Sequence, residues 1–237
     1  MDKSLVVFDF DHTILNDNAD TSVFNLISNK DMARKLWDQY EEGKWTEFMN
    51  KVMTFLFESQ ISYDEIKNEL ISLPLVPGMT DVLEYLGKNP AYDCIILSDA
   101  NSLFIKTILE AKGLMWTVNE VITNPAEVES SGKVVIQPCH VHSHSTCPSN
   151  MCKGTLLSQL KQKKGDNYYK KVCYVGDGSN DLCPCLQLSS NDFAFPRIGY
   201  KLEKRLQCIM SSEKGKIHAQ IVKWESGSDI LNVIRTL

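Results

Sequence analysis

The sequence predicts an α/β fold with a doubly wound, Rossmann-type parallel sheet and one inserted helical segment. Three short apolar runs, at residues 5–8, 94–97 and 172–175, each end in polar or acidic side chains. Such runs are typical of strands that are buried on both faces, as in a parallel sheet. Between residues 79 and 237 strand patterns alternate with helical periodicity, which indicates βαβ units. Because ligands bind beyond the carboxyl ends of such strands, we expect the functional site where the three runs end.

The composition is that of an ordinary globular protein. A chain of 237 residues with 43% apolar residues is long enough to bury a sizeable core. The net charge of -5 argues against nucleic acid as a partner, since binding its phosphates needs a concentrated basic surface. We expect no membrane-spanning helix, because no apolar stretch of about 18 residues is present. A core strand begins at residue 5, so we expect no secretory signal, a cytoplasmic protein and reduced thiols.

Residues 20–74 have the spacing of helices. Apolar residues recur there at three and four positions and predict three or four helices without a strand. The segment lies between the first strand and the alternating elements. We therefore interpret it as a helical cap inserted into a core of residues 1–19 and 75–237. Two prolines and a glycine within residues 73–78 break helical structure and mark the return to the core.

The remaining elements are assigned from periodicity and turn residues. The expected strands cover residues 93–98, 118–123, 171–175, 193–195 and 218–224. The expected helices cover residues 79–87, 101–112, 153–163, 180–188, 200–210 and 228–237. Residues 134–137 are interpreted as one arm of a hairpin that turns at Ser130, Ser131 and Gly132.

Two carboxylates follow the first strand. Asp9 and Asp11 are two positions apart, so they would point to the same side if the strand continued. Two such close anions repel each other, and Mg²⁺ would offset the repulsion because it favours carboxylates together with water and substrate phosphate. On its own, an Asp-x-Asp pair is more often a solvated turn. A second acidic group follows the third run, where Asp177 and Asp181 stand among glycines that allow close backbone approach and positive φ.

Four stretches together resemble the haloacid dehalogenase superfamily of aspartate-nucleophile phosphatases. They are residues 9–13 (Asp-Phe-Asp-His-Thr), Ser98, Lys153 and residues 176–181 (Gly-Asp-Gly-Ser-Asn-Asp). The resemblance covers nearly the whole chain. It implies a Mg²⁺-dependent hydrolase that cleaves phosphomonoesters through an aspartyl-phosphate intermediate. The alternative is a non-catalytic metal-binding or interaction protein on the same fold, although every motif residue is present.

The resemblance also implies a role for each motif residue. Asp9 would be the nucleophile, and Asp11 the general acid and then the general base. Mg²⁺ would be held by the Asp9 carboxylate, the Asp11 main-chain carbonyl and Asp177. These roles suit phosphoryl transfer, in which positioning and electrostatics carry most of the catalysis. Asp11 must be protonated in the first step, which requires a pKa raised by burial and by neighbouring negative charge.

Four further residues complete this implied site. By the same likeness, Ser98 and Lys153 would bind the phosphoryl oxygens. Asn180 or Asp181 would support the metal site from behind its direct ligands. A lysine ammonium beside the nucleophile would also screen the approach of one anion to another.

The surroundings of the motifs narrow the resemblance to the branch of phosphoethanolamine/phosphocholine phosphatases and pyridoxal phosphate phosphatases. Residues 9–20, 97–101 and 147–153 carry this finer likeness. In that branch the aspartates that match Asp20 and Asp99 contact the substrate. A cap that closes over the site favours a small phosphorylated metabolite. Asp20 could equally serve as the N-cap of a helix.

Two features of the cap bear on the substrate. Four aromatic residues have spacings that could turn them toward the cap interior: Trp37, Tyr40, Trp45 and Phe48. Their faces would attract a quaternary ammonium, although such a set is more often an apolar core. A phosphoserine-type amino-acid phosphatase is the alternative, and it would need a cation for the substrate carboxylate. Arg34 is the only arginine in the segment.

A group of cysteines and histidines precedes Lys153. It comprises Cys139, His140, His142, His144, Cys147 and Cys152. Thiolate and imidazole ligands suit tetrahedral Zn²⁺, and a structural zinc ion could stiffen this loop. The spacing matches no standard zinc module, so chance clustering is the alternative. The other five cysteines, at positions 94, 173, 183, 185 and 208, are expected to be core thiols.

Overall fold

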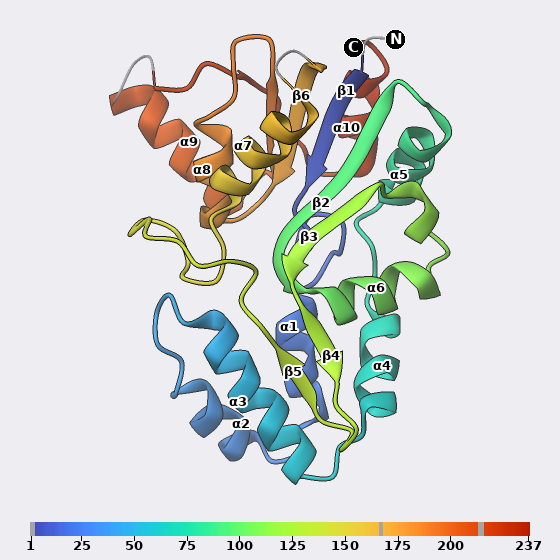
Figure 1. Ribbon diagram of the computed structural model, residues 1–237, viewed down its shortest axis with the longest axis vertical. Helices are drawn as coiled ribbons and strands as arrows, with labels where there is room; N and C mark the ends of the chain where they lie inside the picture. Colours follow the sequence, from blue (N-terminus) through green and yellow to red (C-terminus); the bar gives the residue numbers. More distant parts are fainter. Residues whose placement is uncertain (1–2, 166–167, 213–215) are drawn as a thin grey trace.

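The computed structural model describes residues 3–165, 168–212 and 216–237 (Figure 1). Its main sheet has six parallel strands in the described part of the chain, in the order β3-β2-β1-β6-β7-β8. The strands are β1 (Lys3–Phe8), β2 (Tyr92–Asn101), β3 (Glu120–Asn124), β6 (Tyr169–Gly176), β7 (Phe193–Pro196) and β8 (Gln220–Ile221). The order reverses between β1 and β6, so the predicted doubly wound parallel sheet is confirmed.

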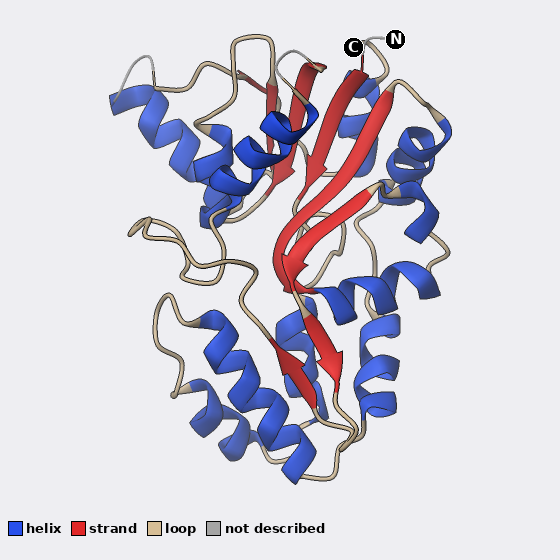
Figure 2. Cartoon of the chain, viewed as in Figure 1, coloured by secondary structure: helices blue, strands red, loops and turns tan. Residues whose placement is uncertain are grey.

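Helices cover both faces of this sheet (Figure 2). One face carries α5 (Met79–Lys88), α6 (Ser102–Ala111) and α10 (Gly227–Ile234), and the other carries α7 (Lys153–Lys164), α8 (Leu182–Cys185) and α9 (Lys201–Ser212). Side chains of β1 alternate between the two apolar layers: Val6 and Phe8 pack into one, Leu5 and Val7 into the other. The apolar run of β1 is therefore explained by burial on both faces.

The register brings three strand ends to one edge. Phe8 pairs with Ile96 of β2 on one side and with Val175 of β6 on the other. The Asp9 amide donates to the Val175 carbonyl at 2.9 Å, which extends the pairing by one step. Polar residues that follow these strands therefore meet across the point where the strand order reverses.

Between β1 and α5 the described chain forms helices and no strand, and these helices run from residue 19 to residue 72. They are α1 (Ala19–Ser22), the 3₁₀ helix η1 (Val23–Leu26), α2 (Lys30–Trp37), α3 (Trp45–Glu58) and α4 (Tyr63–Ser72). They lie beyond the carboxyl edge of the sheet (Figure 1). The chain enters and leaves this block side by side, because Leu15 and Leu75 form an antiparallel bridge. The exact division into core and cap at residues 19/20 and 74/75 stays a prediction.

A hairpin from the second half of the chain joins the helical block. It consists of β4 (Ala126–Val128) and β5 (Val134–Ile136), as the turn at Gly132 predicted. The Asn50 side chain of α3 makes two hydrogen bonds with the backbone of Ile136. Its Nδ2 donates to the carbonyl oxygen at 2.6 Å, and its Oδ1 accepts from the amide nitrogen at 2.9 Å. The side-chain amide of Asn50 thus makes the pair of hydrogen bonds that a neighbouring strand would make with β5.

Two expected elements are shorter than predicted. The last strand is confined to Gln220 and Ile221, and Trp224 adds a single bridge to Arg197. The helix expected over 180–188 is a 3₁₀ turn, η3 (Ser179–Asp181), followed by α8, in which Pro184 is accommodated near the start, where an amide hydrogen is not needed. None of the described helices is both long and apolar enough to cross a membrane.

Candidate active site

A polar cavity of about 1130 Å³ opens beyond the carboxyl edge of the sheet. Asp9, Asp11 and Asp177 line it from the loops that follow β1 and β6. Tyr40 and Trp45 line it from the helical block. The predicted acidic pair and Asp177 of the second acidic group therefore face one shared cavity, whereas Asp181 is buried behind it.

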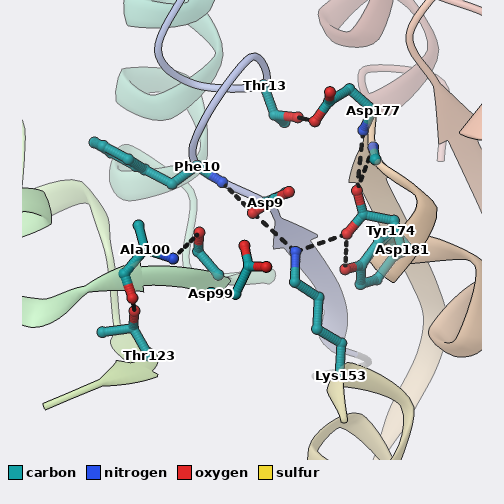
Figure 3. A network of polar contacts seen from close by, with 12 residues as sticks. Asp9, Phe10, Thr13, Asp99, Ala100, Thr123, Lys153, Tyr174, Asp177 and Asp181 are labelled. Atoms are coloured by element: carbon teal, nitrogen blue, oxygen red, sulfur yellow. Dashed lines mark hydrogen bonds and ion pairs between the residues drawn. The ribbon is translucent and has the colours of Figure 1, made fainter. Parts of the chain in front are cut away.

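Asp9 lines this cavity, and its hydrogen bonds hold it in a fixed orientation (Figure 3). Its side chain is 5% exposed, and its Oδ1 accepts hydrogen bonds from the Phe10 amide at 2.7 Å and from Lys153 Nζ at 2.9 Å. No described residue donates a hydrogen bond to its Oδ2. One carboxylate oxygen is thus anchored while the other is left available for chemistry.

Lys153 stands between two carboxylates, as Figure 3 shows. Its Nζ lies 2.9 Å from Asp9 Oδ1 and 2.8 Å from Asp181 Oδ1, and its side chain is 1% exposed. Burial alone would lower the pKa of the ammonium, but Asp181 and Asp9 outweigh it and the net shift is upward. Lys153 is therefore a permanent cation inside the protein.

Asp181 is an organising residue whose oxygens are fully occupied. Oδ1 accepts from Lys153 and from the Tyr174 hydroxyl at 2.7 Å, and Oδ2 accepts from the amides of Asp177 at 3.1 Å and Gly178 at 2.9 Å. These four hydrogen bonds hold the loop after β6 in place and explain how a completely buried carboxylate is tolerated.

The two glycines of this loop are needed for close approach and not for positive φ. A Cβ at Gly176 would lie 2.5 Å from Asp181 Oδ2, so a side chain there would displace that carboxylate. A Cβ at Gly178 would lie 2.4 Å from Asn180 Oδ1. The φ of Gly178 is -91°, and Gly176 has no positive φ either, so the expectation of positive φ was wrong.

The carboxylates at this edge fit a hard divalent cation. Oxygens of Asp9, Asp177 and Asp181 all lie within 4.8 Å of one another. Asp181 is saturated by hydrogen bonds, whereas Asp177 receives one long bond of 3.4 Å, from Thr13. Burial and the charge of Asp181 raise the pKa of Asp177 to about 7, a shift that a bound cation would reverse. Asp9 and Asp177 could thus hold a hard cation such as Mg²⁺ directly, with Asp181 behind them.

Asp11 is a buried carboxyl with few partners. Its Oδ1 accepts from the Ala19 amide at 2.9 Å. Burial, followed by the charge of Asp20, raises the pKa of Asp11 well above its usual range, and the Ala19 hydrogen bond only partly opposes this. Asp11 can therefore carry a proton near neutral pH, as a general acid must.

The alternative explanation of Asp20, as the N-cap of a helix, is wrong. Asn18 is the N-cap of α1 and accepts from the Thr21 amide. Asp20 lies within α1, 2% exposed, and lines the cavity. It accepts from Trp45 Nε1 at 2.7 Å and from Asn101 Nδ2 at 3.0 Å, so it joins α3 to the end of β2.

Ser98 and Asp99 lie within β2, directly after its apolar run. Asp99 is half-buried and lines the cavity. Ser98 is completely buried, and its Oγ accepts from the Ala100 amide at 3.3 Å. No acceptor among the described residues takes the Ser98 hydroxyl proton, which leaves that proton free for a ligand. Asn180 also lines the cavity, beside Asp177.

One cluster contains the four aromatic residues singled out in the sequence, Trp37, Tyr40, Trp45 and Phe48, and each of the two expectations holds for part of it. Tyr40 and Phe48 have ring centroids 5.3 Å apart, and Tyr40 and Trp45 5.5 Å. Phe48 is buried in the apolar core, whereas Trp37 is exposed. Tyr40 and Trp45 extend from the cluster into the cavity.

Two site residues were missed by sequence reasoning. Arg197 donates to the His12 carbonyl and to Asn16 Oδ1, both at 2.6 Å, and so holds the loop that follows Asp9 and Asp11. Tyr174 binds Asp181, although it reads in the sequence as an ordinary strand residue. Neither has a local signal, because its partner is set by tertiary structure.

Comparisons with known proteins relate this chain to phosphatases. The family model described as Putative Phosphatase matches residues 4–237. A pyridoxal phosphate phosphatase of Mus musculus is 41% identical over 238 residues, which cover 99% of this chain and 98% of that protein. A phosphoethanolamine/phosphocholine phosphatase of Homo sapiens is 34% identical over 96% of this chain and 86% of that protein. A substrate-bound phosphoserine phosphatase structure has the same fold, with a TM-score of 0.65 at 17% identity, covering 100% of this chain and 99% of that one.

Proposed function

This chain belongs to the Putative Phosphatase family, within the haloacid dehalogenase superfamily, and on that premise we propose that it is a Mg²⁺-dependent phosphomonoesterase that uses an aspartyl-phosphate intermediate. The observation that carries the proposal is the state of Asp9. Its Oδ1 is fixed by Phe10 and Lys153, its Oδ2 is free, and Asp177 lies within metal-sharing distance. A carboxylate arranged in this way is suited to attack phosphorus.

The proposed reaction has two steps on these residues. An Asp9 carboxylate oxygen forms a bond to phosphorus while the bond from phosphorus to the ester oxygen breaks, and the Asp11 proton passes to that oxygen. Asp11, now ionised, takes a proton from water as the water attacks phosphorus and releases Asp9. The raised pKa of Asp11 supports its first role.

The negative charge of the phosphoryl group would be neutralised from two sides, by a bound metal ion and by side chains of the protein. Mg²⁺, bound by Asp9, Asp177 and the Asp11 carbonyl, would supply Lewis-acid stabilisation of the phosphoryl oxygens. Lys153 Nζ and the Ser98 hydroxyl would bind those oxygens from the protein side. Ion pairs with Asp9 and Asp181 hold Lys153 in position, so its charge needs little reorganisation during the reaction.

The substrate is proposed to be a small phosphomonoester with a basic or cationic nitrogen: pyridoxal 5'-phosphate, phosphoethanolamine or phosphocholine. Asp20, Asp99 and Glu42 line the cavity and would attract such a nitrogen. Tyr40 and Trp45 would stack on a pyridine ring or receive an ammonium on their faces. We rank pyridoxal 5'-phosphate first, because relatives named for that substrate are 40% and 41% identical to this chain.

A phosphoserine-type substrate is less well served. It would need a cation near the helical block for its carboxylate, but Arg34 is exposed and does not line the cavity. The lysines and arginines that do line it are the exposed Lys201, Lys204 and Arg205, all on α9 of the core. The solved phosphoserine phosphatases share the fold at 13% to 18% identity, and a likeness at that level does not indicate a shared substrate.

A phosphate-release screen with Mg²⁺ tests the proposal. Specificity constants would be compared for pyridoxal 5'-phosphate, phosphoethanolamine, phosphocholine and phosphoserine. We expect the first three to exceed phosphoserine, and Asp9→Asn to abolish turnover while the exposed Asp81→Asn control retains it. Normal turnover by Asp9→Asn would exclude the mechanism, and a preference for phosphoserine would exclude the substrate class.

A further inference from the structure

A second cluster of ligand-type side chains lies outside the phosphatase site. His144 and Cys147 come from the long loop that follows β5, Cys152 stands immediately before α7, and Cys183 belongs to α8. Cys152 Sγ lies 3.2 Å from His144 Nδ1, 3.6 Å from Cys147 Sγ and 3.8 Å from Cys183 Sγ. We propose that these four residues form a structural Zn²⁺ site with three thiolates and one imidazole.

The distances from Cys152 Sγ to the other three ligand atoms match tetrahedral zinc. Ligand atoms of His144, Cys147 and Cys152 all lie within 4.8 Å of one another, and Cys183 is placed beside this group by its contact with Cys152. With Zn–S near 2.3 Å and Zn–N near 2.0 Å, a tetrahedron separates two sulfur atoms by about 3.8 Å and a sulfur from a nitrogen by about 3.5 Å. The distances around Cys152 agree to within a few tenths of an ångström. A disulfide would need a separation near 2.05 Å, and all these cysteines are free.

The chemistry of the cluster separates it from the phosphatase site. Thiolate and imidazole select Zn²⁺, whereas the oxygens of Asp9 and Asp177 select a hard cation such as Mg²⁺. Four protein ligands leave no open coordination position, which indicates a structural ion and not a catalytic one. Binding releases three thiol protons and leaves a complex with one net negative charge.

The structure changes the membership expected from sequence. Cys183, expected to be a core thiol, joins the cluster from a separate element. His142 is engaged elsewhere, because its Nε2 lies 2.7 Å from the Pro148 carbonyl oxygen and its Nδ1 accepts from the His144 amide. Cys139 packs against the apolar layer beneath α7, and Cys208 is exposed on α9, so Cys208 is not a core thiol either.

Glycine at position 154 makes the cluster geometrically accessible. A Cβ there would lie 2.5 Å from Cys183 Sγ, so any side chain would hold α7 and α8 apart. The close approach of the two helices is what brings Cys183 to Cys152. The cluster therefore depends on the packing of two elements and not on one loop alone.

The proposed ion would tie together the parts that carry the phosphatase site. Cys152 directly precedes Lys153, and Cys183 follows Asp181 by two residues. Both partners of the buried ion pair between Lys153 and Asp181 would therefore be anchored beside the metal. The same loop continues to Ser149, whose Oγ and amide both donate to the Gly43 carbonyl between α2 and α3, at 2.6 Å and 3.2 Å. Zinc would thus fix the loop that connects the core to the helical block at the rim of the cavity.

Metal analysis of the full chain, purified without chelator or added zinc, tests the site. We expect about one Zn per chain. Cys147→Ser and Cys183→Ser should lose most of this zinc, whereas Cys139→Ser, in the same loop, and Cys208→Ser should keep it. Zinc-free wild-type protein would overturn the proposal, as would zinc that all four variants retain equally.

Cobalt substitution keeps the test decisive if a ligand variant folds poorly. Zinc would be removed from wild-type protein with a chelator and replaced by Co²⁺. Four-coordinate cobalt with three thiolates should give intense visible absorption and sulfur-to-cobalt charge-transfer bands. Weak octahedral absorption would overturn the proposal. Both readouts are independent of turnover, so they separate this proposal from that of the phosphatase mechanism.

Discussion

Lys153 Nζ lies 2.9 Å from Asp9 Oδ1 in a place where the two side chains are 1% and 5% exposed. A buried ion pair gives little net stability by itself, but removing one partner leaves the other as an uncompensated charge. The position of Lys153 therefore affects both folding and reactivity.

Lys153→Met should reduce both activity and stability. It strips the counter-charge from Asp9 and Asp181, so we expect the free energy of unfolding to fall by about 3 kcal/mol or more. We expect kcat to fall by about a hundredfold or more, since an electrostatic contact to the reacting group is lost. Urea unfolding and phosphate release measure the two effects. Lys163→Met, exposed on the same helix, is the control, and equal behaviour of the two variants would contradict the assignment.

Tyr174→Phe removes one hydrogen bond to the buried Asp181 carboxylate, 2.7 Å long. A hydrogen bond to a charged acceptor contributes about 1.5–3 kcal/mol. Tyr92→Phe is a matched control, because the Tyr92 hydroxyl donates to the neutral Ile234 carbonyl at 2.8 Å. We expect Tyr174→Phe to lower the midpoint of urea unfolding more than Tyr92→Phe does. The reverse order would show that Asp181 does not depend on Tyr174.

The strand ends of the site could be predicted from sequence, and their partners could not. Asp9, Ser98 and Asp177 each follow an apolar run, and a parallel sheet brings such strand ends to one edge whatever else the chain does. Cys183 lies 31 positions from Cys152, and no local pattern relates the two. Their contact depends on how α7 packs on α8, which periodicity does not specify.

Arg197 illustrates the same limit over a longer separation. It is 185 positions from His12, whose carbonyl it binds, and it also stacks on Tyr200 with its guanidinium carbon 4.7 Å from the ring centroid. His12 itself has a φ of +53°, an unusual conformation that neighbouring contacts must hold. The sequence shows a histidine within a motif but not the strain or the arginine that stabilises it.

Arg197→Lys should therefore disturb catalysis through positioning. Lysine keeps the charge but cannot reach His12 and Asn16 together with the two nitrogens of a planar guanidinium. We expect kcat to fall by about tenfold with little change in KM, because the loop that carries Asp11 loosens while the substrate contacts remain. Steady-state kinetics test this, with Arg34→Lys, exposed and outside the cavity, as the control. A rise in KM at constant kcat would instead place Arg197 in substrate binding.

Asp20 should make substrate selection depend on pH. Burial, followed in smaller measure by the charge of Asp99, raises the pKa of Asp20 to about 7, against the hydrogen bonds from Trp45 and Asn101 that lower it. Below that pH the carboxyl is neutral, and above it the carboxylate can attract a cation. The ratio of specificity constants for phosphoethanolamine over phenyl phosphate, which lacks a cationic end, should therefore rise as the pH increases from 6 to 8.

The ratio isolates Asp20, because steps that both substrates share cancel in it. Asp20→Asn keeps the size of the side chain and cannot ionise, so the ratio should become independent of pH. At pH 8 the KM of this variant for phosphoethanolamine should also be about tenfold higher, which is equivalent to about 1.4 kcal/mol of lost binding. An unchanged pH dependence in Asp20→Asn would assign the titration to another group, of which Asp99, at the same cavity, is the next to replace with asparagine.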